Sequence, residues 1–185
     1  EQISRLLCST RKLRSRFATL SRASDPTVML HTDFITEVYD MKLTFKKLDP
    51  KAFIPSRATQ GSAGMDICAC LDEPVVLQPN EIKMIPTGIT AEPDRSDIAL
   101  LVYPRSGLSA KFGVSLANCV GVVDSDYRGE WFIPLINHSS APFTVEHGMR
   151  IAQLIPTPIL IPEIEVSDEL SATDRGEGGF GSSGI

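Results

Sequence analysis

The chain has 185 residues, of which 42% are hydrophobic and 22% charged, a composition typical of one globular domain with extensions. Its net charge of −5 is uneven, because residues 1–24 hold six basic and one acidic residue and the remaining body therefore carries −10. An acidic body excludes stable nucleic-acid binding, which needs a basic face, and no apolar run is long enough to cross a bilayer.

The N-terminal stretch 1–24 is rich in Arg and Ser and nearly free of acids, which is typical of an organelle transit segment. A disordered basic tail or a cloning remnant would have the same composition. A secretory signal is disfavoured because no unbroken apolar h-region is present. We interpret residues 1–40 as a basic, flexible extension and linker, and we expect an intracellular protein of the nucleus or cytoplasm, with the mitochondrion as the alternative through this extension.

Beyond Met41 the sequence predicts many short strands. MKLTFKKL alternates apolar and polar positions, and later apolar runs such as PVVL, IALLVYP, EWFIPLIN, RIAQLIPTPIL and EIEV are separated by turn signals. No segment has a long helical period, so we predict an all-β sandwich or jelly roll over residues 41–170. One short helix is expected at SGLSAKFG, capped by Ser106. The tail 171–185 is expected to be flexible without a ligand.

The four cysteines do not predict a metal site. Cys68 and Cys70 are two residues apart, which places them on one face of a strand as small hydrophobic side chains. A zinc site needs a second close Cys/His pair, and none accompanies Cys8 or Cys119. We therefore interpret all four as reduced thiols.

Two early stretches carry residues of chemical interest. Asp66 follows Gly64 at the entry to a strand, where it is either a turn residue or an outer ligand of a bound cation. In PRSGLSAKFGV, residues 104–114, Arg105 and Ser106 stand where a strand gives way to the predicted helix. Free amides at a helix start attract phosphate, although a plain cap beside a solvated arginine would look the same.

The stretch NCVGVVDSDYRGEW, residues 118–131, predicts a hairpin whose tip holds two acids and an aromatic ring. The turn preference of aspartate explains Asp126 well. It explains Asp124 poorly, because Asp124 closes an apolar strand and is expected to be partly desolvated. A carboxylate there can accept a proton from a water that attacks phosphorus. Tyr127 either lies under a sugar or simply packs.

The last two stretches are GMRIAQL, residues 148–154, and RGEGGFGSSGI, residues 175–185. Arg150 and Gln153 interrupt an apolar strand, where they either face solvent or reach a phosphate. The glycine-rich tail cannot fold alone, yet it carries Arg175, Phe180 and paired serines. The three histidines (His31, His138 and His147) lie in the linker or at turns and are expected at the surface.

Taken together and in this order, these stretches resemble the five signature motifs of the trimeric dUTPase family (deoxyuridine 5′-triphosphate nucleotidohydrolases). The motifs correspond to SAGMDICA, PRSGLSAKFGV, NCVGVVDSDYRGE, GMRIAQL and RGEGGFGSSG, and the resemblance runs from about Met41 to the C-terminus. It implies a jelly-roll-like β subunit that forms a homotrimer with active sites at the subunit interfaces. The implied reaction is Mg2+-assisted hydrolysis of dUTP to dUMP and pyrophosphate, which keeps uracil out of DNA and supplies dUMP for thymidylate synthesis.

The resemblance also assigns roles to residues. Asp124 would activate the water that attacks the α-phosphorus, Asp66 would contact the water shell of the metal, and Tyr127 would lie against the deoxyribose. The uracil edge would be recognised by Asn118 and by the backbone of Gly121, Val122 and Val123. Phosphate oxygens would be held by Arg105, Ser106, Gly107, Arg150 and Gln153. In the tail, Phe180 would cover uracil, Arg175 would pair with the γ-phosphate, and Gly181, Ser182 and Ser183 would donate to phosphate.

Two other functions are compatible with such a chain. A dCTP deaminase of the same fold would need a catalytic glutamate and a different pattern after Ser106. A non-catalytic β-sandwich interaction module would not need Asp124, Arg175 or Phe180. Because Met41 stands where compact members of the family begin, we also hypothesise that residues 1–40 are an isoform-specific or targeting extension that catalysis does not need.

Overall fold

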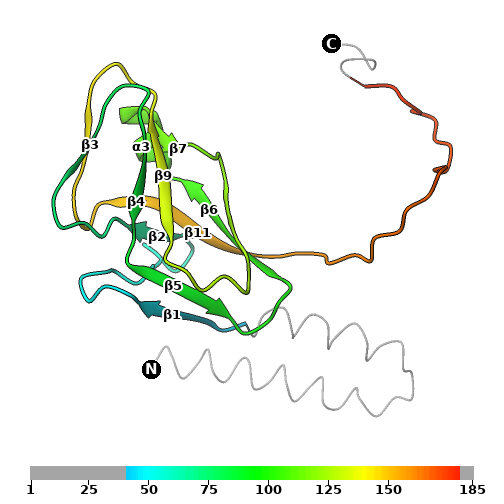
Figure 1. The fold of residues 1–185 in the computed structure, drawn as a ribbon, viewed down its shortest axis with the longest axis horizontal. Coiled ribbons are helices and arrows are strands. Elements are labelled where there is room, and N and C mark those ends of the chain that lie inside the picture. Colours follow the sequence, from blue (N-terminus) through cyan, green and yellow to red (C-terminus); the bar gives the residue numbers. More distant parts are fainter. Residues whose placement is uncertain (1–40, 180–185) are drawn as a thin grey trace.

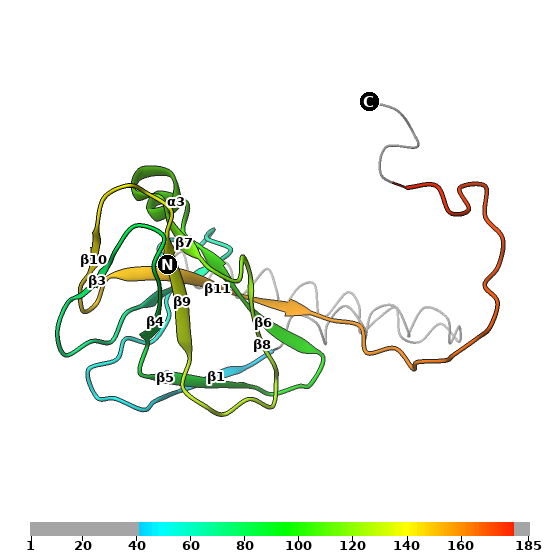
Figure 2. The ribbon, with the colours of Figure 1, turned by 45° about the horizontal axis from the view of Figure 1, so that its top comes forward.

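The computed structural model describes residues 41–179, which form eleven short strands and one short helix (Figures 1 and 2). This architecture confirms the predicted all-β fold class. Within residues 41–179, no helix has the length and apolar character of a membrane span. In chain order the elements are β1 (Leu43–Lys47), β2 (Met65–Cys68), β3 (Val75–Leu77), β4 (Ile82–Pro86), β5 (Ile89–Pro93), β6 (Ile98–Pro104), α3 (Ser106–Phe112), β7 (Val114–Leu116), β8 (Gly121–Val123), β9 (Phe132–Asn137), β10 (Phe143–Val145) and β11 (Arg150–Pro158).

All strand pairs of the described chain are antiparallel. A four-stranded sheet has the order β2-β11-β6-β8 and a three-stranded sheet the order β4-β9-β7, while β1 pairs with β5 and β3 with β10. The long strand β11 lies between β2 and β6, so Gln153 is flanked by Asp66 on one side and Tyr103 on the other. Residues far apart in the sequence are thus brought to one place on the sheet.

The hydrophobic core follows the alternation of the strand sequences. In β9, Ile133 and Leu135 are buried whereas Phe132 is exposed. Leu100 of β6 and Leu154 of β11 are also fully buried. Burying one such side chain stabilises the fold by about 1.5–3 kcal/mol, so these inward-facing residues hold the sheets together.

Two buried polar side chains fix the ends of β9. Thr87 donates a hydrogen bond to the carbonyl of Trp131 at 2.6 Å. Asn137 donates to the carbonyls of Leu77 at 3.1 Å and Ala141 at 2.7 Å. Because a buried polar group must find a partner, these bonds set the position of β9 and of the tryptophan that precedes it.

The predicted helix is present as α3, but Ser106 does not cap it. The N-cap residue is Arg105, whose backbone is extended (φ −93°, ψ 127°) and whose side chain makes no capping hydrogen bond. The carbonyl of Arg105 accepts the N–H groups of Leu108 and Ser109, which makes Ser106 the first helical residue. The helix ends at Gly113, whose φ of 68° favours glycine. The Ser106 hydroxyl thus makes no capping bond, and no other residue of the described range 41–179 binds it.

The predicted hairpin over residues 118–131 is wrong. Its two strands do not pair with each other, because β8 pairs with β6 whereas β9 pairs with β4 and β7. The turn between them therefore connects two sheets. Since β8 and β9 diverge, space opens between them.

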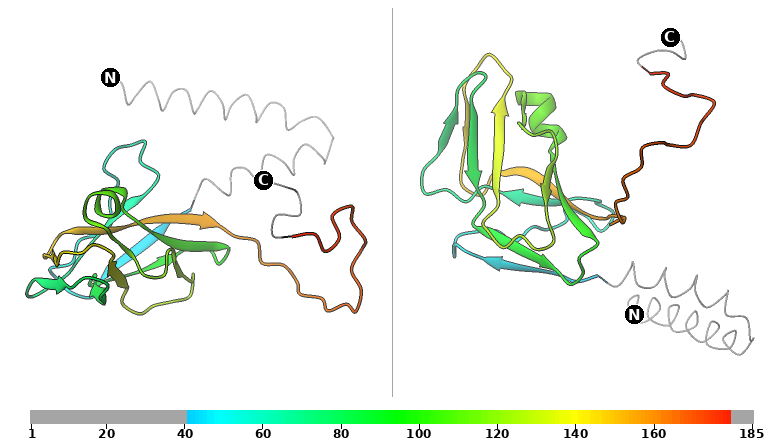
Figure 3. Two further views of the ribbon diagram at one scale, coloured as in Figure 1. Left: turned by 90° about the horizontal axis from the view of Figure 1, so that it is seen from above. Right: turned by 45° about the vertical axis from the view of Figure 1, so that its right-hand side comes forward.

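The chain after β11 forms neither a helix nor a strand up to residue 179, so the strand expected at EIEV is absent. This segment runs away from the sheets in every view (Figures 1–3). After Ile159, whose N–H bonds the carbonyl of Asp97, the hydrogen bonds of residues 160–179 join only residues of that same segment. Apolar side chains of this segment are exposed to solvent, and Leu160, Ile164 and Val166 are each 88–93% exposed. We call residues 159–179 the C-terminal arm.

Candidate active site

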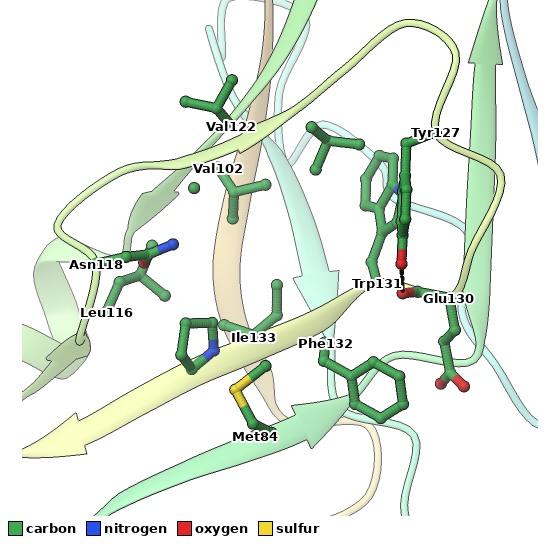
Figure 4. Close-up of a pocket in the computed structure, with 13 residues that line it drawn as sticks. Met84, Val102, Leu116, Asn118, Val122, Tyr127, Glu130, Trp131, Phe132 and Ile133 are labelled. Carbon is green, nitrogen blue, oxygen red and sulfur yellow. Dashed lines mark hydrogen bonds between the residues drawn. The ribbon is translucent and has the colours of Figure 1, made fainter.

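A cavity of about 230 Å3 lies between the diverging strands β8 and β9 (Figure 4). We call it the base cavity. The view shows Tyr127 and Trp131 on one side and Asn118 on the other, with Met84 and Phe132 beneath. Its lining residues are Met84, Val102, Leu116, Asn118, Gly121, Val122, Val123, Tyr127, Glu130, Trp131, Phe132, Ile133 and Pro134. The structure thus brings together Asn118, Gly121, Val122, Val123 and Tyr127, all of which were predicted to meet the nucleoside.

Asn118 is available to a ligand. Its backbone carbonyl accepts the N–H of Val120 at 2.6 Å, and its side-chain amide makes no hydrogen bond to residues 41–179. Gly121 lies beside it, and a Cβ at that position would come within 3.2 Å of Cβ of Val102 and 3.5 Å of Nδ2 of Asn118. Glycine at 121 therefore keeps the entrance beside the Asn118 amide open.

The ring of Tyr127 is held by its neighbours in the turn. Its hydroxyl donates to the carbonyl of Glu130 at 3.1 Å, and Oε1 of Glu130 accepts the N–H of Gly88 at 2.8 Å. A Cβ on Gly129 would lie 2.3 Å from the Tyr127 hydroxyl oxygen, so only glycine allows this ring position. Trp131, the one tryptophan of the chain, is buried, and its Nε1 has no partner among the described residues.

Asp124 stands at the rim of the base cavity. It directly follows Val123, which lines the cavity, and its carbonyl accepts the N–H of Tyr127 at 3.2 Å to close the turn. Its carboxylate has no hydrogen-bond or ion-pair partner within residues 41–179, and the residue is exposed. Residues 41–179 therefore do not supply the partial desolvation expected for Asp124, because nothing in that part of the chain covers its side chain.

A second cavity, of about 310 Å3, adjoins the start of α3, and we call it the phosphate cavity. It brings together Asp66, Arg105, Ser106, Gly107 and Gln153, five of the residues predicted to hold phosphate or metal. The rest of its lining comes from Ala58, Ser62, Ala63 and Gly64.

Asp66 organises the two arginines here. Its Oδ1 accepts a hydrogen bond from Nε of Arg105 at 2.8 Å, and its Oδ2 accepts one from Nη1 of Arg150 at 3.0 Å. The Asp66 side chain is 17% exposed and balances only one of the two guanidinium charges, so the cluster is positive. Nearby, burial raises the pKa of the Cys68 thiol and the Asp66 carboxylate raises it further, so Cys68 adds no negative charge.

Gln153 is fixed between two strands. Its Nε2 donates to the carbonyl of Pro104 at 2.9 Å, and one hydrogen of that amide remains for a ligand. A Cβ on Gly64 would come within 2.6 Å of Oε1 of Gln153, so the glycine gives the amide its room. The orientation of Gln153 is therefore decided by β6 on one side and by the residue just before β2 on the other.

Of the predicted site residues in the tail, Arg175 is the one within residues 41–179, and it lines neither cavity. Arg175 lies on the C-terminal arm, where its Nε donates to the carbonyl of Gly178 at 2.7 Å. Phe180, Gly181, Ser182 and Ser183 lie outside the described residues. The base cavity and the phosphate cavity have no lining residue in common.

Comparison with known proteins decides the family. A family model described as dUTPase matches residues 50–184. A deoxyuridine 5′-triphosphate nucleotidohydrolase of Desulfitobacterium hafniense is 44% identical over 145 residues, covering 78% of this chain and 96% of its own. The corresponding Coxiella burnetii (strain Dugway 5J108-111) protein is 43% identical over 150 residues, covering 81% and 99%. The chain belongs to the dUTPase family.

A solved dUTPase supports the same assignment. The Staphylococcus bacteriophage 80alpha dUTPase with dUPNHPP is 30% identical, superposes with a TM-score of 0.70, and covers 78% of this chain and 99% of its own. In the dUTPase fold of our chain, β4 supplies Met84 to the base cavity and β9 supplies Phe132 and Pro134. These residues were not found from the sequence, because they stand in apolar runs, KMIPTGI and EWFIPLIN, that predict strands and not a ligand site.

The described part of this dUTPase chain has no preformed metal cage. Within residues 41–179, no group of three His, Cys, Asp or Glu side chains is placed to hold a metal ion. One carboxylate, Asp66, faces the phosphate cavity, and two guanidinium groups already hold it. This donor set fits Mg2+ that arrives with phosphate oxygens and water as its main ligands, which is the coordination magnesium prefers at phosphate sites.

Proposed function

We propose that this protein hydrolyses dUTP to dUMP and pyrophosphate with Mg2+, keeping uracil out of DNA and supplying dUMP for thymidylate synthesis. One observation carries the proposal: the base cavity has the Asn118 amide inside it and the carboxylate of Asp124 at its rim, and neither group has a partner in residues 41–179. Base recognition and a proton acceptor therefore lie at the two ends of the same strand, β8.

Uracil is recognised by a strand edge. Among the strands of residues 41–179, β8 pairs only with β6, so the backbone groups on its other edge are left for a ligand that offers alternating donors and acceptors. Asn118 and the backbone of Gly121, Val122 and Val123 supply those contacts. Because the backbone approaches the base closely, the 5-methyl group of thymine has no room.

Tyr127 selects the sugar. Its ring is fixed by the bond to the Glu130 carbonyl and by the absence of a side chain on Gly129. A rigid ring against the deoxyribose leaves no space for a 2′-hydroxyl, so UTP is disfavoured.

The triphosphate is held by positive charge and oriented donors. Arg105, Ser106 and Gly107 lie at the start of α3, where the free Ser106 hydroxyl and the backbone N–H groups can donate to phosphate oxygens. Arg150 and Gln153 add donors from β11. The positive charge left over beside Asp66 offsets the charge of the phosphate chain.

In the reaction, the oxygen of a water molecule bonds to the α-phosphorus while the bond from that phosphorus to the β-phosphate oxygen breaks. Pyrophosphate leaves with the bonding electron pair, and Asp124 accepts the proton of the water. Aspartate has a reference pKa of about 3.9 and is a weak base, so positioning and electrostatic stabilisation supply most of the acceleration. Mg2+, when bound to the phosphates, neutralises part of their charge, with Asp66 facing its water shell.

The active site is shared between copies in a homotrimer. The base and phosphate cavities of one chain are separate. The C-terminal arm extends away from the sheets of its own chain, and its apolar side chains are exposed to solvent. The outer face of β4 and β9 is also apolar, with Ile82, Met84 and Phe132 exposed beside the base cavity. A second copy covering these surfaces removes apolar area from water and brings the two half-sites together.

The tail of a neighbouring copy closes the site over bound nucleotide. Phe180 covers uracil and Arg175 pairs with the γ-phosphate, while Gly181, Ser182 and Ser183 donate to phosphate oxygens. Ordering this tail costs conformational entropy, which contacts to a triphosphate offset and contacts to a monophosphate do not. The tail therefore opens for product release.

The chain is divided by role. Residues 41–170 form the catalytic β domain, residues 171–185 the closing tail, and residues 1–40 an extension that catalysis does not need. We place the protein inside the cell, in the nucleus or cytoplasm, with the mitochondrion as the alternative if residues 1–24 act as a transit segment.

Pyrophosphate release from dUTP tests the proposed function. With Mg2+ present, the purified protein should release pyrophosphate from dUTP and far less from dTTP, dCTP or UTP. A deaminase would instead release ammonia from dCTP. Pure protein that leaves dUTP intact, or that cleaves dTTP equally fast, would contradict the proposal.

A further inference from the structure

The guanidinium group of Arg128 makes three hydrogen bonds, and the proposed reaction assigns it no role. Its Nη1 donates to the carbonyl oxygens of Ser125 at 2.7 Å and of Tyr127 at 3.2 Å. Its Nη2 donates to Oε1 of Glu92 at 2.7 Å, and Glu92 belongs to β5. One guanidinium group thus binds the backbone of the turn between β8 and β9 and ties it to a strand of a different sheet.

The end of the turn has its own ties to the preceding strands, because Oε1 of Glu130 accepts the N–H of Gly88 at 2.8 Å and Trp131 bonds Thr87 and Ile89. Its tip, residues 125–128, has one further tie besides Arg128 within residues 41–179, and it is weaker. The hydroxyl of Ser125 donates to the carbonyl of Ser96 at 3.3 Å, which is a long bond between neutral groups. The bond between Arg128 and Glu92 is charged on both sides, and charge-assisted hydrogen bonds are roughly twice as strong as neutral ones. Of the two ties at the tip, the one through Arg128 is therefore the stronger.

We propose that Arg128, anchored by Glu92, is a positioning residue that holds the carboxylate of Asp124 and the ring of Tyr127 in place at the base cavity. Arginine suits this role because its planar fork reaches two carbonyls and a carboxylate at once, whereas lysine is a single point charge. The kinetic part of this inference rests on the proposed dUTP hydrolysis.

The restraint is local. The side chains of Arg128 and Glu92 are 47% and 59% exposed, and exposed ion pairs contribute little to global stability. Lys51 provides a matched control, because its side chain is also 47% exposed and pairs with acids elsewhere on the surface. Losing Arg128 should therefore change the turn and its chemistry, whereas losing Lys51 should change neither.

Steady-state kinetics of full-length variants test the chemical consequence. Arg128→Ala should lower kcat/KM for dUTP about tenfold, since an ångström of displacement can cost about a hundredfold in rate. The preference for dUTP over UTP should fall with it, because Tyr127 moves, and Arg128→Lys should recover only part of the loss. Lys51→Ala should keep both values of the wild type. If Arg128→Ala has the same kcat/KM for dUTP and the same preference for dUTP over UTP as Lys51→Ala, the proposal is overturned.

Hydrogen exchange without substrate tests the restraint independently of any activity. In Arg128→Ala, and less strongly in Glu92→Ala, peptides covering residues 124–130 should exchange faster while those of β6 and β11 stay protected. Unchanged exchange in the turn, or equally fast exchange throughout the sheets, would overturn a local positioning role. If the wild type leaves dUTP intact, the proposed function fails, and this measurement still decides the role of Arg128.

Discussion

Asp124 and Asp126 stand two residues apart in one exposed turn, which makes them a matched pair. Asp124→Asn should lower kcat by about 10²- to 10⁴-fold, the contribution of a lost general base, while a non-hydrolysable dUTP analogue still binds. Pyrophosphate release and calorimetric binding would measure the two effects. Asp126→Asn should behave like the wild type. Equal losses in both variants would mean that the turn, not the Asp124 carboxylate, matters.

Any side chain at position 129 would collide with the ring of Tyr127. A Cβ there would lie 2.3 Å from the hydroxyl oxygen of Tyr127 and 2.5 Å from its Cζ, so Gly129→Ala must displace the ring. We expect the ratio of kcat/KM for dUTP over UTP to fall several-fold, because the ring no longer excludes a 2′-hydroxyl. Gly61→Ala is the control, since a Cβ at that position meets nothing within 4 Å. An unchanged ratio in Gly129→Ala would contradict the role given to Tyr127.

At the residue scale, the motifs predicted which residues gather at the cavities better than how those residues are held. Asn118 and Tyr127 meet in the base cavity, and Asp66, Arg105, Ser106, Gly107 and Gln153 meet in the phosphate cavity, while the roles assigned to them stay predictions. The ties of Arg128 and Glu130 were not predictable, because their partners on β5 and at Gly88 lie about forty residues earlier in the chain.

At the scale of elements, local patterns predicted the strands and the helix but not how the strands pair. Alternation identified β1, and apolar runs identified β6 and β11. The same patterns predicted that β8 and β9 form a hairpin, which is wrong because each strand has stronger partners in a different sheet. Pairing depends on competition among distant strands, and a local pattern contains no information about it.

Removing the tail tests whether it acts as a lid. Deleting residues 171–185 should leave the thermal unfolding temperature nearly unchanged, because residues 171–179 make no hydrogen bond to the sheets. Turnover of dUTP should fall by about 100-fold or more, since closure no longer completes the site. Thermal unfolding and pyrophosphate release on the same sample would check this. Full activity in the truncated protein would show that the tail is dispensable.

At the scale of the whole molecule, a mixing experiment tests shared active sites. Full-length Asp124→Asn lacks the base, and a chain ending at residue 170 lacks the tail, so each alone should be nearly inactive. Refolding them together should restore part of the activity, because some sites then combine an intact Asp124 with an intact tail from a different chain. Mixing two truncated chains, one of them carrying Asp124→Asn, is the control and should restore nothing. Mixed trimers without recovered activity would contradict sharing in trans.

The role of residues 1–40 is also a question for the whole molecule. Deleting them should change kcat/KM for dUTP by less than about twofold, because the strands of the β domain begin at Leu43 and a terminal extension is often dispensable. Steady-state assays of the two forms would measure this. A large loss of activity after the deletion would refute the hypothesis that the extension serves only targeting or isoform identity.

By itself, the sequence determined the fold class and the chemistry, because alternation, turn residues and five ordered motifs are all local properties of the chain. Tertiary structure alone decided that β8 and β9 diverge around a cavity, that Asp66 holds two arginines, and that the C-terminal arm leaves its own sheets. The physical reason is that strand pairing, burial and ion pairing are settled between residues tens of positions apart. Such contacts leave no periodic trace in a single sequence.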